Sequence, residues 1–420
     1  MESVKYNLKR AWRYVFTLLR WVVVAAVTGG IGGVVGAAFH LSVEKVTALR
    51  EANNWLIFLL PVGGLLIAGM YKLARLESAG TDVVIDAVRS KHSVPILLAP
   101  LIFVSTVITH LCGGSAGREG AALQLGGSIG AQVGRWFRLD EKDMHLVTLC
   151  GMSGVFSALF GTPLTATVFA LEVISVGVVY YSGIVPCLIS ALIAYGISLL
   201  FHLEPVRFSV GAIPSYSWQS VGKVVALAAA CAALSIGFCL LMTFTHKGAE
   251  KLLKNPFLRA AVGGTLILLL SLIFPRDYNG AGMPLIEQAI GGSALPCAFL
   301  LKMLFTAVTI GFGFKGGEIV PTFFIGATFG CTLGGLLGLP SGFGAAIGLV
   351  SLFCGVVNCP IASVFLSIEL FGIGGLLYFA VVCAFSFALS GYFGLYSSQK
   401  IIYSKTRAEY ININTWKEIE

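Results

Sequence analysis

Apolar stretches long enough to cross a lipid bilayer recur along this chain, from residues 15–40 near the N-terminus to residues 360–393. A helix needs roughly 20 predominantly apolar residues to span a hydrocarbon core about 30 Å thick. Hydrophobic residues make up 57 % of the chain and charged residues only 11 %, and a water-soluble fold could not bury that much apolar surface. The sequence therefore predicts an all-α, polytopic, integral membrane protein in which residues 1–420 form one membrane domain.

The net charge of +8 is concentrated in the short polar flanks of the apolar stretches. The positive-inside bias then predicts a cytoplasmic N-terminus. The first apolar stretch has full spanning length, so we expect a retained membrane segment and not a cleaved signal peptide. After Tyr403 the chain becomes a short polar tail, and no regulatory domain is expected. The cations that precede the first apolar stretch are Lys5, Lys9, Arg10 and Arg13.

Glycine is abundant, with 51 residues, and eight of them lie between Gly113 and Gly134. Small residues allow helices to pack closely in lipid, and unwound segments need glycine backbones. The same segment places Arg118 and Glu119 within an otherwise uncharged stretch. Because several apolar stretches are also too short to span a bilayer, broken and re-entrant helices are predicted in place of a simple bundle.

A proline followed nine residues later by a glutamate occurs twice, as Pro163 with Glu172 and as Pro360 with Glu369. The two copies are equally spaced, because 360 − 163 and 369 − 172 both equal 197. The residues between them are also similar, so we expect two homologous halves, inverted if each has an odd number of spans. Each glutamate is expected to have a structural role at a helix end. The halves are expected at about residues 10–245 and 255–403.

The segment around Glu119 has the features of an anion-binding site. Glycines on both sides of Glu119 leave backbone N–H groups accessible at an expected helix N-terminus, where the partial positive charge attracts anions. Partial charges and hydroxyl groups replace the water around a halide without trapping it as a full positive charge would. The first-half residues expected at the site are Gly117, Arg118, Glu119, Gly120 and Ala121.

The carboxylate of Glu119 would compete with an anion for the same N–H donors, and its protonation would vacate the site. Glu119 is therefore expected to act as a gate and as a proton carrier. The alternative is a structural ion pair between Arg118 and Glu119 inside the protein. Adjacent side chains usually point apart, which argues against this alternative.

A second segment with glycines, charges and a helix start lies at residues 315–326. A proline such as Pro321 suits the first turn of a helix, and the N-terminus of this helix is expected to converge on the same ion. Glu318 is either a site residue or a first-turn helix charge without a transport role. The second-half residues expected at the site are Gly317, Ile319, Val320, Pro321 and Phe323.

These segments resemble the CLC family of chloride channels and proton-coupled anion antiporters. The family's glutamate-gate motif Gly-Arg-Glu-Gly is matched at residues 117–120, its Gly-x-Phe-x-Pro motif at 317–321, with Ile319 in place of phenylalanine, and its pore tyrosine by Tyr396. The resemblance implies an inverted repeat of about 16 to 18 short, tilted helical segments. It also implies a homodimer with one pore per subunit in the lipid of a bacterial-type plasma membrane. The expected cargo is a halide, chloride or fluoride, moved with or without proton antiport.

Two further departures from the family pattern limit what the resemblance implies. Where the family has Gly-Ser-Gly-Ile-Pro, this chain has a different sequence at 77–82, so the hydroxyl near the central ion is expected from Thr81 or Ser78. The inner glutamate of the chloride/proton antiporters is replaced by Val173, as in the channels and in the fluoride-exporting branch. A chloride channel, a chloride antiporter and a fluoride/proton antiporter all stay open. The altered first motif favours fluoride being carried at least as well as chloride.

Other function classes have weaker support in the sequence. An intramembrane serine hydrolase would use Ser153 or Ser115 with His110 or His145 as the base, but short serine motifs are expected in a chain this rich in glycine and serine. The six histidines are dispersed and lack metal-ligand spacing. We therefore expect no enzyme activity, no metal or other cofactor, and no nucleic-acid partner.

Overall fold

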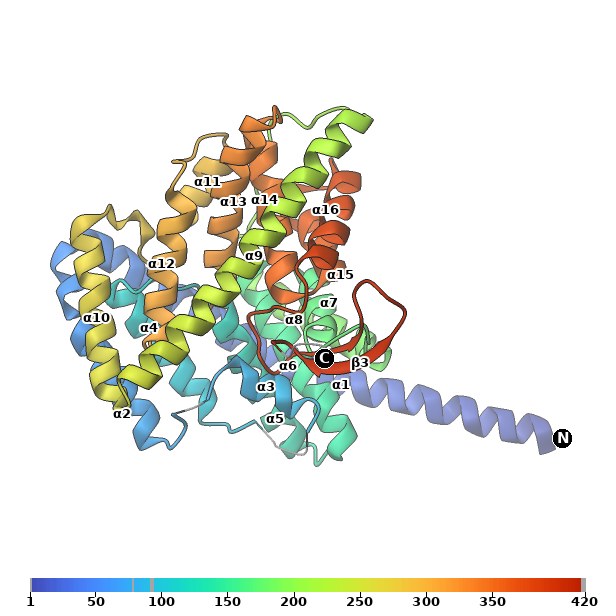
Figure 1. The fold of residues 1–420 in the computed structure, drawn as a ribbon. Coiled ribbons are helices and arrows are strands. Elements are labelled where there is room, and N and C mark those ends of the chain that lie inside the picture. Colours follow the sequence, from blue (N-terminus) through green and yellow to red (C-terminus); the bar gives the residue numbers. More distant parts are fainter. Residues whose placement is uncertain (1, 78, 91–93, 417–420) are drawn as a thin grey trace.

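The computed structural model describes residues 2–77, 79–90 and 94–416, and it consists largely of α-helices (Figure 1). A backbone segment in lipid must satisfy its hydrogen bonds internally, which a helix does. The apolar stretches accordingly form helices, and the predicted all-α membrane fold is confirmed. In chain order the helices are α1 (Glu2–Ala52), α2 (Leu60–Leu73), α3 (Thr81–Ala87), α4 (Leu98–Cys112), α5 (Glu119–Trp136), α6 (Glu141–Phe160), α7 (Pro163–Glu172), α8 (Ile184–Leu200), α9 (Trp218–Leu252), α10 (Pro256–Ile273), α11 (Met283–Ile290), α12 (Ala298–Gly311), α13 (Ile319–Leu336), α14 (Ser341–Val357), α15 (Pro360–Phe371) and α16 (Leu376–Leu389).

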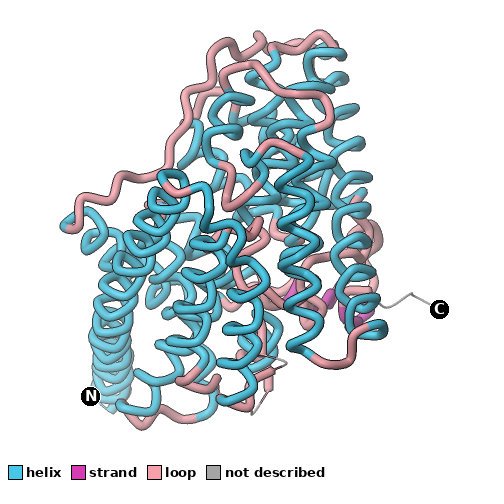
Figure 2. Tube along the Cα trace, turned by 90° about the vertical axis from the view of Figure 1, so that its left-hand side faces the viewer, coloured by secondary structure: helices cyan, strands magenta, loops and turns pink. Residues whose placement is uncertain are grey.

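The helix lengths agree with a multi-pass protein whose spans are partly interrupted. Seven helical segments of the described chain are long and apolar enough to cross a bilayer, and five other apolar helices have only 10–17 residues. Figure 2 shows these helices of unequal length packed side by side, with the loops mostly at their ends. α1 has 51 residues in all, and its N-terminal part projects from the body of the molecule (Figure 1).

Two tightly packed helix pairs, α5 with α6 and α13 with α14, form the buried centre. A Cβ added to Gly126 would lie 2.2 Å from the carbonyl oxygen of Gly151, and a Cβ added to Gly326 would lie 2.5 Å from that of Gly348. Only glycine permits such a close approach of two backbones. The abundant glycines therefore serve helix contact in the centre, as the sequence predicted.

The internal repeat extends over many more helices than the Pro–Glu motif indicated. α4 and α12 begin 200 residues apart (298 − 98), and so do α5 and α13 (319 − 119). α6 has 20 residues and α14 has 17. This difference of three residues turns the separation of 200 into the separation of 197 that the sequence shows at α7 and α15.

The contacts between helices repeat in the same order. α1 packs against α6 and α8, and α9 packs against α14 and α16. The repeated units are thus α1–α8 and α9–α16. We propose that the division lies in residues 201–217, between α8 and α9, and not at residues 246–259, where the polar sequence suggested it. The polar stretch at 246–259 falls instead on the end of α9 and the start of α10.

The glutamates of the Pro–Glu motif cap each other's helices. Glu172, at the end of α7, accepts a hydrogen bond from the backbone N–H of Ala362 at 2.8 Å. Glu369, near the end of α15, accepts one from the N–H of Thr165 at 2.8 Å. Because the end of each helix lies at the start of the other, α7 and α15 are antiparallel. The predicted inversion and the predicted structural role of the two glutamates are confirmed.

The C-terminal end of the chain pairs with a short strand of the first half in a small sheet that the sequence did not predict. Its strands are β1 (Ser175–Val176), β2 (Lys400–Tyr403) and β3 (Tyr410–Asn414). β2 pairs in parallel with β1 and in antiparallel fashion with β3. Since β1 follows α7, the sheet ties the end of the second half to the first half.

Candidate functional site

The two Gly-rich segments meet through a pair of backbone hydrogen bonds. The N–H of Gly117 donates to the carbonyl of Gly317 at 2.7 Å, and the N–H of Gly317 donates to the carbonyl of Gly117 at 2.7 Å. We call this contact the glycine bridge. α5 begins at Glu119 and α13 begins at Ile319, so each helix starts two residues after the bridge. Two helix N-termini from opposite halves therefore converge, as the sequence predicted.

The glycine bridge changes which N–H groups are free to bind an anion. Gly117 and Gly317 use their N–H groups for each other, because buried backbone groups need partners, and Pro321 has no N–H at all. These three predicted ligands therefore donate no backbone hydrogen bond to an ion in this arrangement. A helix leaves its first N–H groups without internal partners. The candidate donors that remain are the N–H groups of Gly120, Ala121, Ile319 and Val320.

Glu119 is 1 % exposed, and its carboxylate folds back over the start of its own helix. Its Oε2 accepts a hydrogen bond from the N–H of Arg118 at 2.9 Å. A Cβ added to Gly117 would lie 2.6 Å from this Oε2 and 3.1 Å from the Cβ of Val320. The carboxylate thus lies next to the N-termini of both α5 and α13, where their partial charges favour an anion.

Arg118 and Glu119 form the ion pair that the sequence argued against. The Nε of Arg118 lies 3.4 Å from the Oε1 of Glu119. Arg118 precedes the helix, with φ −113° and ψ −11°, so its side chain does not follow the helical direction and reaches back to the carboxylate. The two oxygens of Glu119 have separate partners, because Oε2 takes the N–H and Oε1 faces the guanidinium.

Glu318 holds the position directly before α13 that Arg118 holds before α5. A Cβ added to Gly120 would lie 3.0 Å from the Oε2 of Glu318, so this carboxylate is directed at the start of the opposite helix. The Oε2 atom is buried and has no hydrogen-bond partner among the described residues. Glu318 is therefore placed at the meeting point of the two helices.

Thr81 is the first residue of α3 and hydrogen-bonds to α5. Its hydroxyl donates to the carbonyl of Gly120 at 3.4 Å and accepts from the Nε2 of Gln124 at 3.1 Å. Gln124 is 4 % exposed, and its Oε1 has no partner within the described chain. Gln124 was not predicted from the sequence, although an amide side chain four residues after Gly120 in an apolar stretch is a usable signal. Ser78, the other predicted source of the hydroxyl, lies outside the described residues.

Tyr396 supplies the most available hydroxyl near the site. The residue is 3 % exposed, and its hydroxyl is buried with no partner in the part of the chain that the structure describes. Buried polar groups are normally paired, so this hydroxyl is available to donate a hydrogen bond to a small anion. The main-chain carbonyl of Tyr396 accepts a hydrogen bond from the hydroxyl of Thr415 at 2.7 Å, which fixes the backbone from the C-terminal sheet.

The side chain of Phe323 packs into an aromatic cluster. Its ring centroid lies 5.8 Å from that of Phe160 and 5.4 Å from that of Phe353. Phe156 and Phe169 complete a closed series of ring contacts with these residues. Phe323 therefore contributes a rigid apolar wall beside the start of α13, a role that its position in the motif did not reveal.

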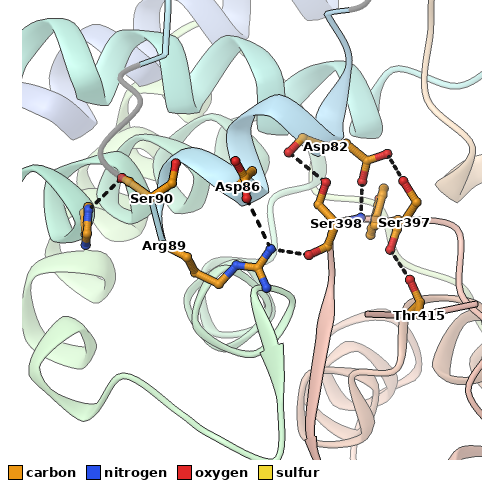
Figure 3. Close-up of polar contacts among 9 residues, drawn as sticks. Asp82, Asp86, Arg89, Ser90, Ser397, Ser398 and Thr415 are labelled. Atoms are coloured by element: carbon orange, nitrogen blue, oxygen red, sulfur yellow. Dashed lines mark hydrogen bonds and ion pairs between the residues drawn. The ribbon is translucent and has the colours of Figure 1, made fainter. Parts of the chain in front are cut away.

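A group of hydrogen bonds joins α3 to the turn after Tyr396 (Figure 3). The carboxylate of Asp82 accepts the N–H of Ser398 at 2.8 Å and the hydroxyl of Ser397 at 2.8 Å. Arg89 donates to the carbonyl of Ser398. We call this group the Asp82 clamp. It holds Thr81 and Tyr396, which are 315 residues apart in sequence, on neighbouring segments (396 − 81).

The serines proposed for a hydrolase lie apart from the proposed bases. The hydroxyl of Ser153 donates to the carbonyl of Cys187 at 3.1 Å, and the hydroxyl of Ser115 bonds to that of Thr306 at 3.1 Å. The ring Nδ1 of His110 contacts the carbonyl of Thr106 at 2.9 Å. In the described chain neither serine bonds to a histidine, so this geometry gives the hydrolase alternative no support.

Comparison with known proteins agrees with this arrangement. Residues 63–391 match the family model of the voltage gated chloride channel. A chloride/fluoride channel protein of Pseudomonas syringae pv. tomato is 35 % identical over 401 residues, which cover 92 % of this chain and 88 % of that protein. An H+/Cl− exchange transporter of Vibrio campbellii is 28 % identical over 382 residues, covering 82 % of this chain and 81 % of that protein.

Solved structures show the same similarity. A CLC-type fluoride/proton antiporter is 30 % identical, with a TM-score of 0.88, and the match covers 91 % of this chain and 98 % of that one. A slow cyanobacterial Cl−/H+ antiporter, at 20 % identity and a TM-score of 0.75, shares the fold. Because the family model covers most of the chain and a relative is 35 % identical over 92 % of it, this chain belongs to the CLC family of membrane anion transport proteins.

Proposed function

We propose that the chain exchanges a halide for protons across the membrane, that it carries fluoride at least as well as chloride, and that Glu119 is its gate and proton carrier. The observation that carries this proposal is the position of the Glu119 carboxylate, which is buried beside two helix N-termini and accepts the N–H of Arg118. A carboxylate there competes with an anion for the same partial charges. Protonation removes that competition.

In the proposed cycle the ionised carboxylate of Glu119 keeps the anion out. An incoming halide is held by the free N–H groups at the starts of α5 and α13 and by the hydroxyl of Tyr396. Thr81 contributes if its hydroxyl turns away from the carbonyl of Gly120, to which it now donates. The displaced carboxylate takes up a proton and releases it on the other side, so one group serves both movements.

The choice of fluoride rests on relatives and on one departure from the chloride antiporters. The 35 % identical relative is named for chloride and fluoride, and the solved structure with a TM-score of 0.88 is a fluoride/proton antiporter. At the position of the inner glutamate stands Val173, which is fully buried and whose carbonyl accepts the Nε2 of Gln399 at 2.9 Å. This position therefore offers no carboxylate to relay a proton.

We further propose a homodimer with one pore per subunit and a cytoplasmic N-terminus. Apolar side chains on α8 and α16 are exposed, such as Leu192 at 47 % and Leu377 at 67 %, and are available to a second copy or to membrane lipid. Arg10 and Arg13 are exposed on the projecting part of α1, which favours the cytoplasmic side. Cross-linking of single cysteines placed on α8 and α16 in native membranes tests the dimer.

A flux assay tests the proposed transport. Purified protein is reconstituted in liposomes, and fluoride, chloride and proton movements are recorded in the same preparation. The proposal expects a fluoride gradient to drive protons in the opposite direction, with a fluoride rate at least equal to the chloride rate. Halide flux without proton movement would identify a passive channel, and chloride flux much faster than fluoride flux would identify a chloride member of the family.

A further inference from the structure

The carboxylate of Asp82 occupies donors that are themselves suited to an anion. It receives a backbone N–H from Ser398 and a hydroxyl from Ser397, both at 2.8 Å, and the hydroxyl of Ser398 donates to the main-chain carbonyl of Asp82 at 3.1 Å. A backbone N–H together with a hydroxyl is the kind of donor set that replaces the water around a halide. Without Asp82 the two donors would be open to a small anion.

The Asp82 clamp lies between the exposed surface of the protein and the buried side chain of Tyr396. Ser397 is exposed and Asp82 is half-buried, whereas Tyr396 is 3 % exposed. Asp82 directly follows Thr81 in the sequence, and Ser397 directly follows Tyr396. Figure 3 shows the contacts of Asp82 with Ser397 and Ser398. An ion that moves between this surface and the hydroxyls of Thr81 and Tyr396 therefore passes beside the carboxylate of Asp82.

Arg89 supplies positive charge with unused donors in the same cluster. One terminal nitrogen of its guanidinium donates to the carbonyl of Ser398 and lies 3.7 Å from a carboxylate oxygen of Asp86. Its Nε and its other terminal nitrogen are buried and have no hydrogen-bond partner among the described residues. Buried guanidinium groups normally use their donors. Arg89 thus has capacity for a second anionic partner beside the clamp.

The Asp82 clamp repeats the arrangement at Glu119 with different elements. In both places a carboxylate accepts a backbone N–H and has an arginine beside it, Arg118 at the first and Arg89 at the second. At both places the carboxylate lies next to residues expected to hold the anion. The two carboxylates belong to different segments, because Glu119 starts α5 and Asp82 lies in the first turn of α3.

We propose that Asp82 is a second competing carboxylate, which closes the surface-side entrance to the ion site until a small inorganic anion displaces it. The displaced side chain leaves the N–H of Ser398 and the hydroxyl of Ser397 to the halide, and Arg89 balances the charge of whichever group is present. This inference rests on the proposed halide transport. No covalent step is involved, and only non-covalent partners are exchanged.

Halide affinity of an Asp82→Asn variant tests this inference. The amide keeps one oxygen to accept from Ser398 and so retains part of the clamp, but it has no charge with which to compete. We expect the apparent KM for fluoride and for chloride in liposomes to fall by about tenfold, the effect of removing one nearby charge, with kcat unchanged or higher. Asp82→Glu, which restores the charge, should return KM toward the wild-type value.

Asp86→Asn provides the matched control, because Asp86 lies on α3, contacts the same arginine, and is exposed. It should leave KM unchanged. Halide titration of the detergent-solubilised proteins by calorimetry, with fluoride and chloride as probes, measures binding even if proton coupling or flux is absent. A lower kcat with unchanged KM and unchanged halide affinity in Asp82→Asn would show a purely structural clamp and overturn the inference. An equal change in Asp86→Asn would do the same.

Discussion

The two helix N-termini at the glycine bridge have the same backbone and different side chains. α5 and α13 each have 18 residues and start at equivalent positions, since 319 − 119 and 336 − 136 both equal 200. The residue before the helix is Arg118 in the first half and Glu318 in the second. The first helical residue is Glu119 in the first half and Ile319 in the second. Only the first half therefore places a carboxylate directly at its own free N–H groups.

The two halves therefore share the backbone that attracts an anion and differ in the side chains beside it. Backbone N–H groups and helix partial charges do not depend on side chains, so the repeat supplies both N-termini with the same attraction for an anion. Only the first half has a carboxylate at the first position of its helix, at Glu119. In the second half the carboxylate of Glu318 precedes the helix by one residue and is directed at the start of α5 instead of at its own helix.

Among the variants that test this difference between the halves, Glu119→Gln should have the largest effect on proton flux. The amide is neutral and neither takes up nor releases a proton in this pH range. Proton flux should therefore fall to the level of protein-free liposomes, while halide flux continues or rises. A pH-sensitive dye and a halide electrode in one liposome preparation give both rates. Glu287→Gln is the control, because Glu287 is an exposed glutamate on α11, and it should keep the wild-type coupling. Wild-type coupling of proton flux to halide flux in Glu119→Gln would contradict the assignment of Glu119 as the gate.

Alanine at the two bridging glycines should affect the halves unequally. A Cβ on Gly317 would lie 2.4 Å from the backbone nitrogen of Gly120, which cannot move independently. A Cβ on Gly117 would first meet the Oε2 of Glu119, and this side-chain atom can move away. Gly317→Ala should therefore lower the unfolding free energy by about 1–3 kcal/mol, and Gly117→Ala by less, with a change in halide flux. Thermal unfolding in detergent measures the difference, and equal losses would contradict it.

The reciprocal caps should differ by a smaller amount. Glu369 accepts the N–H groups of Leu164 and Thr165 and also the hydroxyl of Thr165, whereas Glu172 accepts two N–H groups. Loss of a cap costs about 0.5–2 kcal/mol, so Glu369→Ala should destabilise the protein more than Glu172→Ala. In a Thr165→Val background the gap should narrow, because the extra hydroxyl bond is gone. Chemical unfolding in mixed micelles measures both changes in unfolding free energy. A larger destabilisation by Glu172→Ala than by Glu369→Ala would contradict this prediction.

Where the two halves are equal, equal effects are expected. A Cβ on Gly64 would lie 2.7 Å from the carbonyl oxygen of Ala260, and a Cβ on Gly264 would lie 2.7 Å from that of Leu60. Gly64→Ala and Gly264→Ala should therefore destabilise the protein by amounts that agree within roughly 0.5 kcal/mol. The same thermal unfolding assay measures both. A clear difference would show that the symmetry of the α2–α10 contact does not extend to its energetics.

Local sequence patterns predicted the helix starts well. Glycines followed by a charge placed a helix N-terminus at Glu119, and Pro360 and Pro163 marked the first residues of α15 and α7. Proline has a fixed φ and lacks an N–H, so its preference for a first helical turn is independent of the rest of the fold. The spacing of the Pro–Glu motif also predicted a structural role for Glu172 and Glu369 at the helix ends, whereas the structure shows that each caps the other's helix.

Contacts between distant segments were predicted less well. The ion pair of Arg118 with Glu119 depended on the conformation of the residue before the helix, which a rule about adjacent residues does not include. The N–H groups of Gly117 and Gly317 were expected to bind the ion, but they bind each other. No local pattern predicts this pairing, because the two glycines are 200 residues apart (317 − 117).

The sequence by itself determined the membrane environment, the broken helices, the repeat and the two segments that meet at the candidate ion site, since hydropathy, proline and glycine act over a few residues. Only the tertiary structure decided which N–H groups stay free and that Asp82 fastens α3 to the turn after Tyr396. Hydrogen bonds between segments far apart in the chain depend on how the two inverted halves pack, and no local pattern specifies their partners.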